Sequence, residues 1–536
     1  VGAGRAHLFV APPRRCLALD TSSRHDLGAL TLPTNVTVLM KVSTKVSKFS
    51  MGAAGLPQGA QMSLDRRRFL LSLAAAGGVL SSSKPALASR LLPQAQSGSG
   101  VQPGDWPFST YDIRGTRFNQ HETIIGRGNV ERLKVKWISE AAGNANQTTP
   151  SVVGDSLYFP AHDGYVYALD SSSGALKWKF NAWEGIQPNA PGTWQREVNA
   201  DPVGQMRSAV GYANGRLFVG DSTARMHCLE AATGREIWRT QMDPPAGANR
   251  SKISSAPIIY DGKVYFGTST VAGRSQIACL DAGTGAIRWN FHIVPDPKAL
   301  GGGAVWSASA LDVEYGVVYN VTGSVHGRMP GPMLFSESML ANDMESGELL
   351  WYDQLRSKDP FDLDYSCHPT LFETSHPTRP GAVRSCVGAG SKTGFHTFDR
   401  YSGEHLWTAS VTNGGPTLNS TAYGYDKIFM VSNSAASHRL IAQSATVALH
   451  AYTGEVLWWT PNESRIGSGV AVANGLFYQG FRDGTLQALD VETGSPLWTY
   501  QLPSSRRGGI TISNGTLYTT CGEPPYPVYA FSIDGL

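Results

Sequence analysis

The chain has 536 residues, of which 41% are hydrophobic and 16% charged, so it can bury one large core or two to four ordinary ones. Its net charge of +3 combines two unlike regions: residues 1 to 88 contain 11 Lys or Arg against 3 Asp or Glu, and the remainder contains 34 against 39. This mildly acidic body argues against nucleic acid or an anionic membrane as the main partner.

An export signal is predicted over residues 62 to 88, which contain "DRRRFLLSLAAAGGVLSSSKPALA". A basic cluster, a short apolar run and a small-x-small ending are typical of a cleaved signal, and the run is too short to remain as a transmembrane helix. The paired arginines resemble the twin-arginine type, whose receptor exports folded protein. We therefore expect the mature chain to begin near Ser89.

Residues 1–61 are rich in Ser, Thr and basic residues and contain only two acids. This composition is typical of an organelle transit peptide placed before a second signal, as in proteins sent to the thylakoid lumen of plastids. Alternatively, translation starts at Met51 or Met62, and the signal directs a bacterial protein to the periplasm. In both cases residues 89–104 are expected to form a linker and residues 105–536 the folded body.

A repeat with a period near fifty organises the body. Each copy has an Asp, Glu or His, then Gly four residues later, then Trp four residues after that. The seven copies are LDSSSGALKW (169–178), LEAATGREIW (229–238), LDAGTGAIRW (280–289), NDMESGELLW (342–351), FDRYSGEHLW (398–407), LHAYTGEVLW (449–458) and LDVETGSPLW (489–498).

Each copy is interpreted as a β-hairpin. The acid ends a strand and its carboxylate can accept turn amides, Gly supplies the positive φ, and Trp packs inward from the next strand. A period near fifty with four short strands per unit predicts an all-β, eight-bladed β-propeller. No run of about 18 apolar residues occurs in the body, so no membrane span is expected there.

The eighth blade is predicted to combine both ends of the body. "NVERLKVKW" (129–137) is an outer strand that ends in Trp137, and "RGGITISNGTLYTT" with "PVYAFSIDGL" near the C-terminus supplies three inner strands. Closing the ring in this way avoids exposed strand edges.

Five cysteines follow the signal, and none lies in a C-x-x-C motif, so neither a zinc site nor an attached haem is predicted. Cys367 and Cys386 fall on successive strands of one predicted blade. They could form a disulfide in an oxidising compartment, or remain two buried thiols.

The repeated hairpin, the eight Trp-bearing blades and the opening "DWPFSTYDIRGTRFNQHETIIGRGNVERLKVKW" together resemble the pyrroloquinoline-quinone (PQQ) alcohol dehydrogenases, and among these the polyvinyl alcohol dehydrogenase branch. The resemblance covers roughly residues 105 to 536. It implies a quinone in the central funnel above a Trp floor, with calcium and a basic side chain polarising its carbonyls. An Asp would take the proton of the alcohol while hydride passes to the quinone.

The family motifs place individual roles on this chain. "WSASALDVEYGVVYNVTGS" supplies Trp306 as the floor and has Ser324 where the family has an Asn that binds calcium. "KDPFDLD" places the catalytic base, also a calcium ligand, on Asp362. "GAGSKTGFHTFD" places the basic residue that polarises the quinone on Lys392.

Two features of the family are missing. The third blade, "YDGKVYFGTSTVAGRSQIACLD", has no acid where the calcium-binding Glu would stand, and the chain lacks the adjacent cysteine pair that covers the quinone. Of the three groups that would hold calcium only Asp362 remains, with the Ser324 hydroxyl as a weaker neutral ligand, so both calcium and PQQ are open to question.

Other polar residues stand where inner strands begin and are expected to line the funnel as ligand contacts: Arg207, the serines of "KISSAP", and Asn419. Asp359 and Asp364 flank Asp362 and are interpreted as turn and blade-top residues.

Three functions follow. The first is an exported quinoprotein dehydrogenase that oxidises an alcohol with Asp362 and Lys392 and, lacking haem, passes electrons to an external acceptor. The second is a propeller without cofactor that serves as a protein-binding or assembly scaffold. The third is an active site that uses another metal or a modified cofactor.

Overall fold

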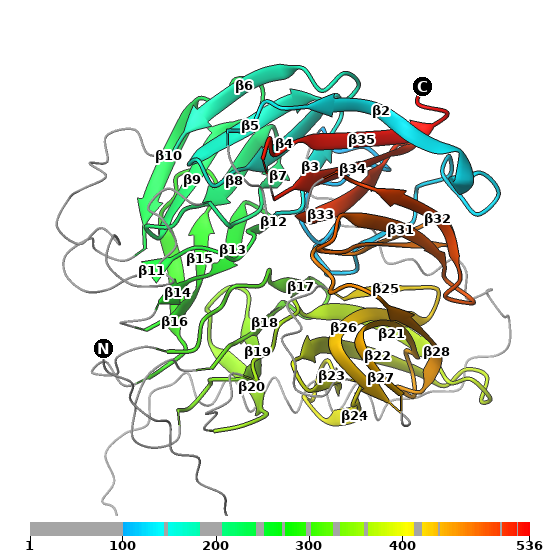
Figure 1. The fold of residues 1–536 in the computed structure, drawn as a ribbon. Coiled ribbons are helices and arrows are strands. Elements are labelled where there is room, and N and C mark those ends of the chain that lie inside the picture. The colour runs from blue at the N-terminus through cyan, green and yellow to red at the C-terminus, as the bar shows by residue number, and fades with distance from the viewer. Residues whose placement is uncertain are drawn as a thin grey trace, which may run out of the picture. The chain divides into compact units, whose positions relative to one another are not determined.

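The fold is taken from a computed structural model of the chain (Figure 1). It describes residues 100–143, 148–182, 206–242, 251–270, 274–295, 302–324, 333–357, 363–411, 421–437, 440–503, 506–522 and 524–536. The predicted export signal and the segment before it lie outside the described residues. All described residues belong to one compact unit, Leu91–Leu536.

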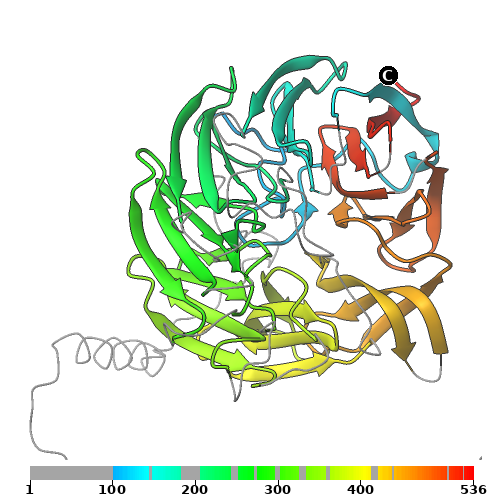
Figure 2. The same ribbon diagram turned by 60° about the vertical axis from the view of Figure 1, so that its left-hand side comes forward.

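Eight antiparallel sheets, the blades, stand around a common axis (Figures 1 and 2). Each blade consists of short strands joined by tight turns. Blade 1 consists of β3 (Ser151–Val153), β4 (Ser156–Pro160), β5 (Tyr165–Asp170) and β6 (Leu176–Asn181). Its first two strands, β3 and β4, are buried along their whole length. Blade 2 consists of β7 (Gly211–Ala213), β8 (Arg216–Gly220), β9 (Arg225–Glu230) and β10 (Glu236–Gln241). Blade 3 consists of β12 (Ile258–Tyr260), β13 (Lys263–Gly267), β15 (Gln276–Asp281) and β16 (Ile287–His292). A separate two-stranded sheet pairs β11 (Ser251–Lys252), which precedes blade 3 in the sequence, with β14 (Ser269–Thr270), which lies between β13 and β15.

The next three blades follow the same order. Blade 4 consists of β17 (Ala310–Asp312), β18 (Val317–Val321), β19 (Ser338–Asp343) and β20 (Leu349–Gln354). Blade 5 consists of β21 (Thr370–Ser375), β22 (Val383–Ser391), β23 (Gly394–Asp399) and β24 (His405–Ala409). Blade 6 consists of β25 (Ala422–Gly424), β26 (Lys427–Ser437), β27 (Leu440–His450) and β28 (Val456–Asn462). Blade 7 has β29 (Ala471–Ala473), β30 (Leu476–Gly480), β31 (Thr485–Asp490) and β32 (Pro496–Gln501), and β1 (Phe118–Asn119) joins it in parallel with β29.

Blade 8 closes the ring with strands from both ends of the body. β33 (Arg506–Ser513), β34 (Thr516–Cys521) and β35 (Val528–Ile533) are followed in the sheet by β2 (Leu133–Ser139), which comes just after the short 3-10 helix η2 (Val130–Arg132). In the β2–β35 register Trp137 lies opposite Ala530. The eight-bladed prediction and the shared last blade are both confirmed.

The repeated hairpin forms as the sequence predicts. In blade 1 the Asp170 carboxylate accepts hydrogen bonds from the amides of Ser172 and Ser173, at 3.1 and 2.9 Å. Hydroxyl and amide donors around this exposed carboxylate hold the pKa of Asp170 at about 2. Gly174 has φ +73°, a conformation that a side chain would strain.

The repeated Trp packs in the core and also joins neighbouring blades. Trp137 of blade 8 lies over Gly174 of blade 1, where a Cβ would come within 2.6 Å of its ring, and its indole N–H donates to the Ser171 carbonyl at 3.1 Å. At the other side of blade 8, Trp498 of blade 7 donates to the Leu133 carbonyl. The seven repeated glycines all lie under the Trp of the preceding blade: Gly174, Gly234, Gly285, Gly347, Gly403, Gly454 and Gly494.

Residues 104–119, here called the inner segment, cross the middle of the ring against the first strands of the blades. Successive carbonyls of this segment accept hydrogen bonds from blades 2, 4, 5, 6 and 7, and Trp106 exchanges hydrogen bonds with Val152 in blade 1. The Asn119 side chain also bonds this segment to blade 8, by donating to the Ile512 carbonyl. A segment without periodic pattern therefore ties the inner strands together.

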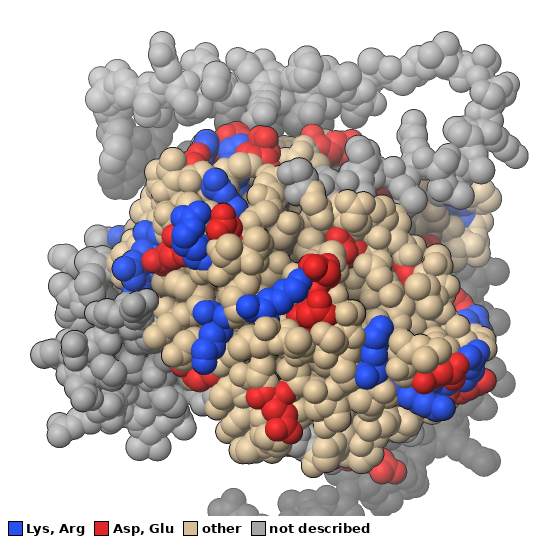
Figure 3. Space-filling view, turned by 90° about the horizontal axis from the view of Figure 1, so that it is seen from above, with Lys and Arg blue, Asp and Glu red and all other residues tan. Residues whose placement is uncertain are grey.

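Cys367 and Cys386 are both free and buried, so the disulfide considered from the sequence is absent. Cys386 lies within β22 and packs in the core of blades 5 and 6, whereas Cys367 precedes β21 and lies against Gly390. No helix among the described residues is long and apolar enough to cross a membrane. Acidic and basic side chains are interspersed on the face shown in Figure 3, without a field of one sign.

Candidate functional site

Three predicted site residues lie at the same end of the inner strands of blades 4 and 5. Trp306 precedes β17, Ser324 follows β18, and Lys392 directly follows β22. In every blade the start of the first strand and the end of the second lie at one end, because the two strands are antiparallel. The fold therefore brings together residues that are up to 86 positions apart in the sequence.

An ion pair that the sequence analysis did not predict forms the centre of this site. The Lys392 ammonium donates to the Asp364 carboxylate at 2.9 Å, and the two side chains are only 7% and 2% exposed. The Lys392 amide also donates to the Asp364 carbonyl at 3.0 Å. The second carboxylate oxygen accepts the amide of Ser324. Asp364 thus connects blades 4 and 5 and holds the ammonium in one place.

Gly323 allows Trp306 and Asp364 to approach each other. A Cβ on Gly323 would lie 2.8 Å from the Trp306 ring and 3.0 Å from the Asp364 carboxylate. Trp306 itself is half-buried, so part of the indole stays accessible beside the ion pair. The arrangement offers a flat apolar surface next to a fixed cation, which suits a planar anionic or carbonyl-bearing ligand.

A second cation supports the same loop. Arg356 follows β20 and pairs with the buried Glu337 carboxylate at 3.1 Å. It also donates to the Leu363 carbonyl at 3.4 Å and the Thr393 hydroxyl at 3.3 Å. Arg356 therefore links the residues on either side of the Lys392–Asp364 pair.

The remaining predicted site residues have different outcomes. Asp359, Asp362 and Asn419 lie outside the described residues, so their predicted roles stay predictions. Arg207 is described and is exposed just before β7. Asp364, interpreted from the sequence as a turn or blade-top residue, is almost fully buried.

The serines of "KISSAP" do not all line a funnel. Ser255 is fully buried and donates to the Ser307 carbonyl of the next blade at 2.9 Å, and Ser208 donates in the same way to the Ser255 carbonyl. These hydroxyls connect successive blades, so Ser255 is not available as a ligand contact.

The described residues fit a quinone better than they fit calcium. Lys392 could polarise a carbonyl and Trp306 could lie against a planar ring. Among the described ranges no group of three or more His, Cys, Asp or Glu side chains is placed to hold a metal ion. Of the two buried carboxylates described here, Asp364 already accepts hydrogen bonds from Lys392 and Ser324, and Glu337 is paired with Arg356.

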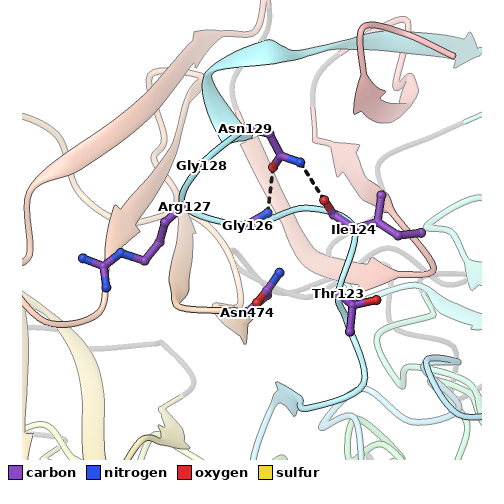
Figure 4. Close-up of a pocket in the computed structure, with 7 residues that line it drawn as sticks. All are labelled: Thr123, Ile124, Gly126, Arg127, Gly128, Asn129 and Asn474. Atoms are coloured by element: carbon purple, nitrogen blue, oxygen red, sulfur yellow. Dashed lines mark hydrogen bonds between the residues drawn. The ribbon is translucent and has the colours of Figure 1, made fainter.

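A separate pocket of about 480 Å³ lies at the opposite end of blade 7 (Figure 4). Residues 123, 124 and 126–129 line it together with Asn474, in the turn between β29 and β30. Asn129 accepts a hydrogen bond from the Gly126 amide and donates one to the Ile124 carbonyl. Its only charged side chain, Arg127, is paired with Asp490 at 2.5 Å. This pocket therefore contributes nothing to the chemistry of the Lys392 site.

The ring of eight antiparallel blades defines the chain as an eight-bladed β-propeller. Residues 106–413 match the family model described as glucose/ethanol/alcohol dehydrogenase, beta-propeller domain, and the chain belongs to this family. Residues 391–523 also match the model of the outer membrane protein assembly factor BamB. The resemblance stated from the sequence is confirmed.

Similar proteins agree with this assignment. The quinohemoprotein alcohol dehydrogenase ADH-IIG of Pseudomonas putida is 28% identical over 374 residues, covering 61% of this chain and 50% of that protein. A polyvinylalcohol dehydrogenase of Sphingopyxis sp. (strain 113P3) is 25% identical, covering 70% and 64%. The solved structure of ADHIIG from Pseudomonas putida HK5 has a TM-score of 0.69 at 20% identity, covering 81% of each chain, which shows the shared fold. The chain spans about half the length of the first of these relatives.

Proposed function

We propose that the chain is an exported quinone-dependent dehydrogenase that oxidises an alcohol and passes the electrons to an external acceptor. The buried Lys392–Asp364 pair beside Trp306, in a chain that belongs to this dehydrogenase family, supports the proposal most strongly. The export signal at residues 62–88 would deliver the protein to a periplasm, or to the thylakoid lumen if residues 1–61 are a transit peptide.

The chain's own residues would divide the work as follows. Lys392, kept in place by Asp364, would face a carbonyl of the ligand, and Trp306 would support its ring. Asp362 would take the hydroxyl proton of the alcohol. Bound PQQ would supply the hydride acceptor. No step is assigned to calcium, because no group of three or more His, Cys, Asp or Glu side chains among the described residues is placed to hold a metal ion.

Substitution of Asp362 tests the proposed base. We expect Asp362→Asn to lower kcat by about 10²–10⁴-fold in protein reconstituted with PQQ, because a positioned base contributes about that much. Dye reduction with a series of alcohols measures the rate. Asp359→Asn, the same change in the same stretch of sequence, should keep most of the activity. Equal losses in the two variants, or no quinone binding at micromolar PQQ, would contradict the proposal.

The match of residues 391–523 to the BamB model favours a second candidate, a protein-binding or assembly scaffold. The missing Glu and the missing cysteine pair also support it. A scaffold should bind no quinone, and Asp362→Asn should leave its cellular role unchanged. Loss of that role in a correctly folded Asp362→Asn protein would contradict the scaffold.

A further inference from the structure

Arg117, in the inner segment, is buried near the ring axis. Its side chain is contacted by residues of blades 7 and 1: Nε donates to the Val470 carbonyl at 2.6 Å, and Nη2 donates to the Thr149 hydroxyl at 2.9 Å. The backbone of Arg117 has φ +52°, and its amide and carbonyl bond Thr110 and Val472. The position of this guanidinium is therefore fixed by its backbone and by two neighbouring blades.

Two other arginines are buried among the described residues, and each has a carboxylate partner. Arg400 pairs with Asp312 at 3.3 Å, and Arg225 pairs with Asp221 at 2.6 Å. Arg117 is only 4% exposed, yet both acceptors that the described structure provides for its side chain are neutral. A guanidinium has five N–H donors, so three remain for another acceptor.

The charge on Arg117 persists in spite of its burial. Burial lowers the pKa of Arg117 to about 9, so it stays protonated at neutral pH. The two titratable groups that interact with it electrostatically supply no negative charge. Burial raises the pKa of Cys367 to about 12, and burial together with the Arg117 charge lowers the pKa of His368 to about 3, so both are neutral. An unpaired buried charge destabilises the folded protein unless a counter-charge is present.

Two glycines lie close to this guanidinium and its Thr149 partner. A Cβ on Gly469 would collide with Nη2 of Arg117, and a Cβ on Gly509 would collide with the Thr149 hydroxyl that Nη2 contacts. At these two positions, one just before β29 and one within β33, the absence of a side chain lets the backbone come close to the guanidinium and its Thr149 partner.

We propose that Arg117 forms a buried binding site for one small monovalent inorganic anion, such as chloride. The anion accepts the remaining guanidinium N–H donors and neutralises the charge between Gly469 and Gly509. This site is separate from the Lys392–Asp364 pair, whose cation already has a carboxylate, and it does not depend on the proposed dehydrogenase activity.

Thermal unfolding of the purified protein tests the site. Sodium chloride is compared with sodium gluconate at equal ionic strength, because gluconate is too large for a cradle of this kind. We expect the Tm to rise with chloride and to saturate, with a total shift on the order of 3 °C at a large excess over Kd. Arg117→Gln should abolish this shift, whereas Arg225→Gln, at an arginine that has its own carboxylate, should keep it.

Crystals soaked in sodium bromide give a direct measurement that does not require a stable variant. We expect one anomalous peak within hydrogen-bond distance of the Arg117 guanidinium. Equal Tm values in chloride and gluconate together with no bromide at Arg117 would overturn the proposal. A saturable chloride effect that persists in Arg117→Gln would also overturn it.

Discussion

At the scale of residues, the Lys392–Asp364 pair is the feature that most needs explanation. Both groups are nearly fully buried, and a buried pair recovers the cost of desolvation only when its remaining hydrogen bonds are satisfied. The Ser324 amide contributes such a bond by donating to the second carboxylate oxygen of Asp364. Burying this pair requires desolvation of both charges, and its structural effect is to hold an ammonium beside Trp306.

A double-mutant cycle measures how strongly the two groups depend on each other. We expect Asp364→Asn to lower the free energy of unfolding by about 3–5 kcal/mol, because it leaves the Lys392 charge buried and uncompensated. Lys392→Met should cost a similar amount. The double variant should cost less than the sum of the two, by about 1–3 kcal/mol. Additive effects in denaturant titrations would show that the two charges are not coupled.

The sequence singled out Lys392 as a candidate site residue, but it did not single out Asp364 as the partner of Lys392. Lys392 stands in a motif with a fixed position after a strand, whereas Asp364 is one of three acids in "KDPFDLD", and their spacing alone does not show which is buried. The distinguishing contact, to Ser324, joins positions 40 residues apart. Only the packing of blade 4 against blade 5 defines it.

At the scale of elements, the hairpin turn and the Trp of the preceding blade form one unit. The spacing of acid, Gly and Trp predicted the hairpin, its Asp-capped turn and the positive φ of its glycine. It did not show that the glycine of one blade lies under the Trp of another, because a periodic sequence does not reveal which copy packs on which. The inner segment could not be predicted either, since it has no repeat and its partners are spread over the ring.

Two glycines of blade 2 with the same backbone conformation separate the effect of Trp packing from the effect of backbone strain. Gly234 and Gly215 both have φ +73°, but a Cβ on Gly234 would overlap the Trp178 ring, whereas a Cβ on Gly215 would meet nothing within 4 Å. We expect Gly215→Ala to cost about 1 kcal/mol of stability and Gly234→Ala about 1–3 kcal/mol more. Denaturant unfolding followed by Trp fluorescence measures both. Equal losses would mean that backbone strain alone requires glycine at position 234.

At the scale of the whole molecule, buried histidines of two kinds shape the dependence of stability on pH. In blade 2 the ring nitrogens of His227 lie 3.2 Å from the Asp221 carboxylate and 2.7 Å from the Glu236 carboxylate. A neutral imidazole has only one N–H, so both bonds require the protonated form. Burial lowers the pKa of His227, but the bonds to the two carboxylates outweigh it and raise the pKa above 6.5.

The raised pKa of His227 predicts a loss of stability on the alkaline side. Its contribution is complete below pH 6.5, the value in the unfolded chain, and is lost as the pH rises through the folded-state pKa, with a slope of at most about 1.4 kcal/mol per pH unit. His227→Gln should remove this decline, while the same change at the exposed His121 should leave it. Parallel pH profiles of unfolding free energy for wild type and His227→Gln would contradict the assignment.

His368 and His396 act in the opposite direction. Burial lowers their pKa values to about 3 and about 4, so each is neutral in the folded protein. Below pH 6.5 these two histidines bind protons in the unfolded chain but not in the folded protein. The free energy of unfolding therefore falls as the pH decreases. The combined contribution of His227, His368 and His396 to the free energy of unfolding is therefore greatest near pH 6.5.

The pairing of β2 with β35 means that the ring can close only after β35 has been synthesised. Leu133 must wait for Ile533, its partner across the sheet, and a ribosome that adds about 5–20 residues per second needs roughly 20–80 s to make the intervening chain. During that interval the first outer strand and the inner segment have no ring to enter, and seven growing blades present an open edge. Until β35 has been made, the exposed strand edges of the incomplete ring have to be kept from pairing with strands of other polypeptide chains.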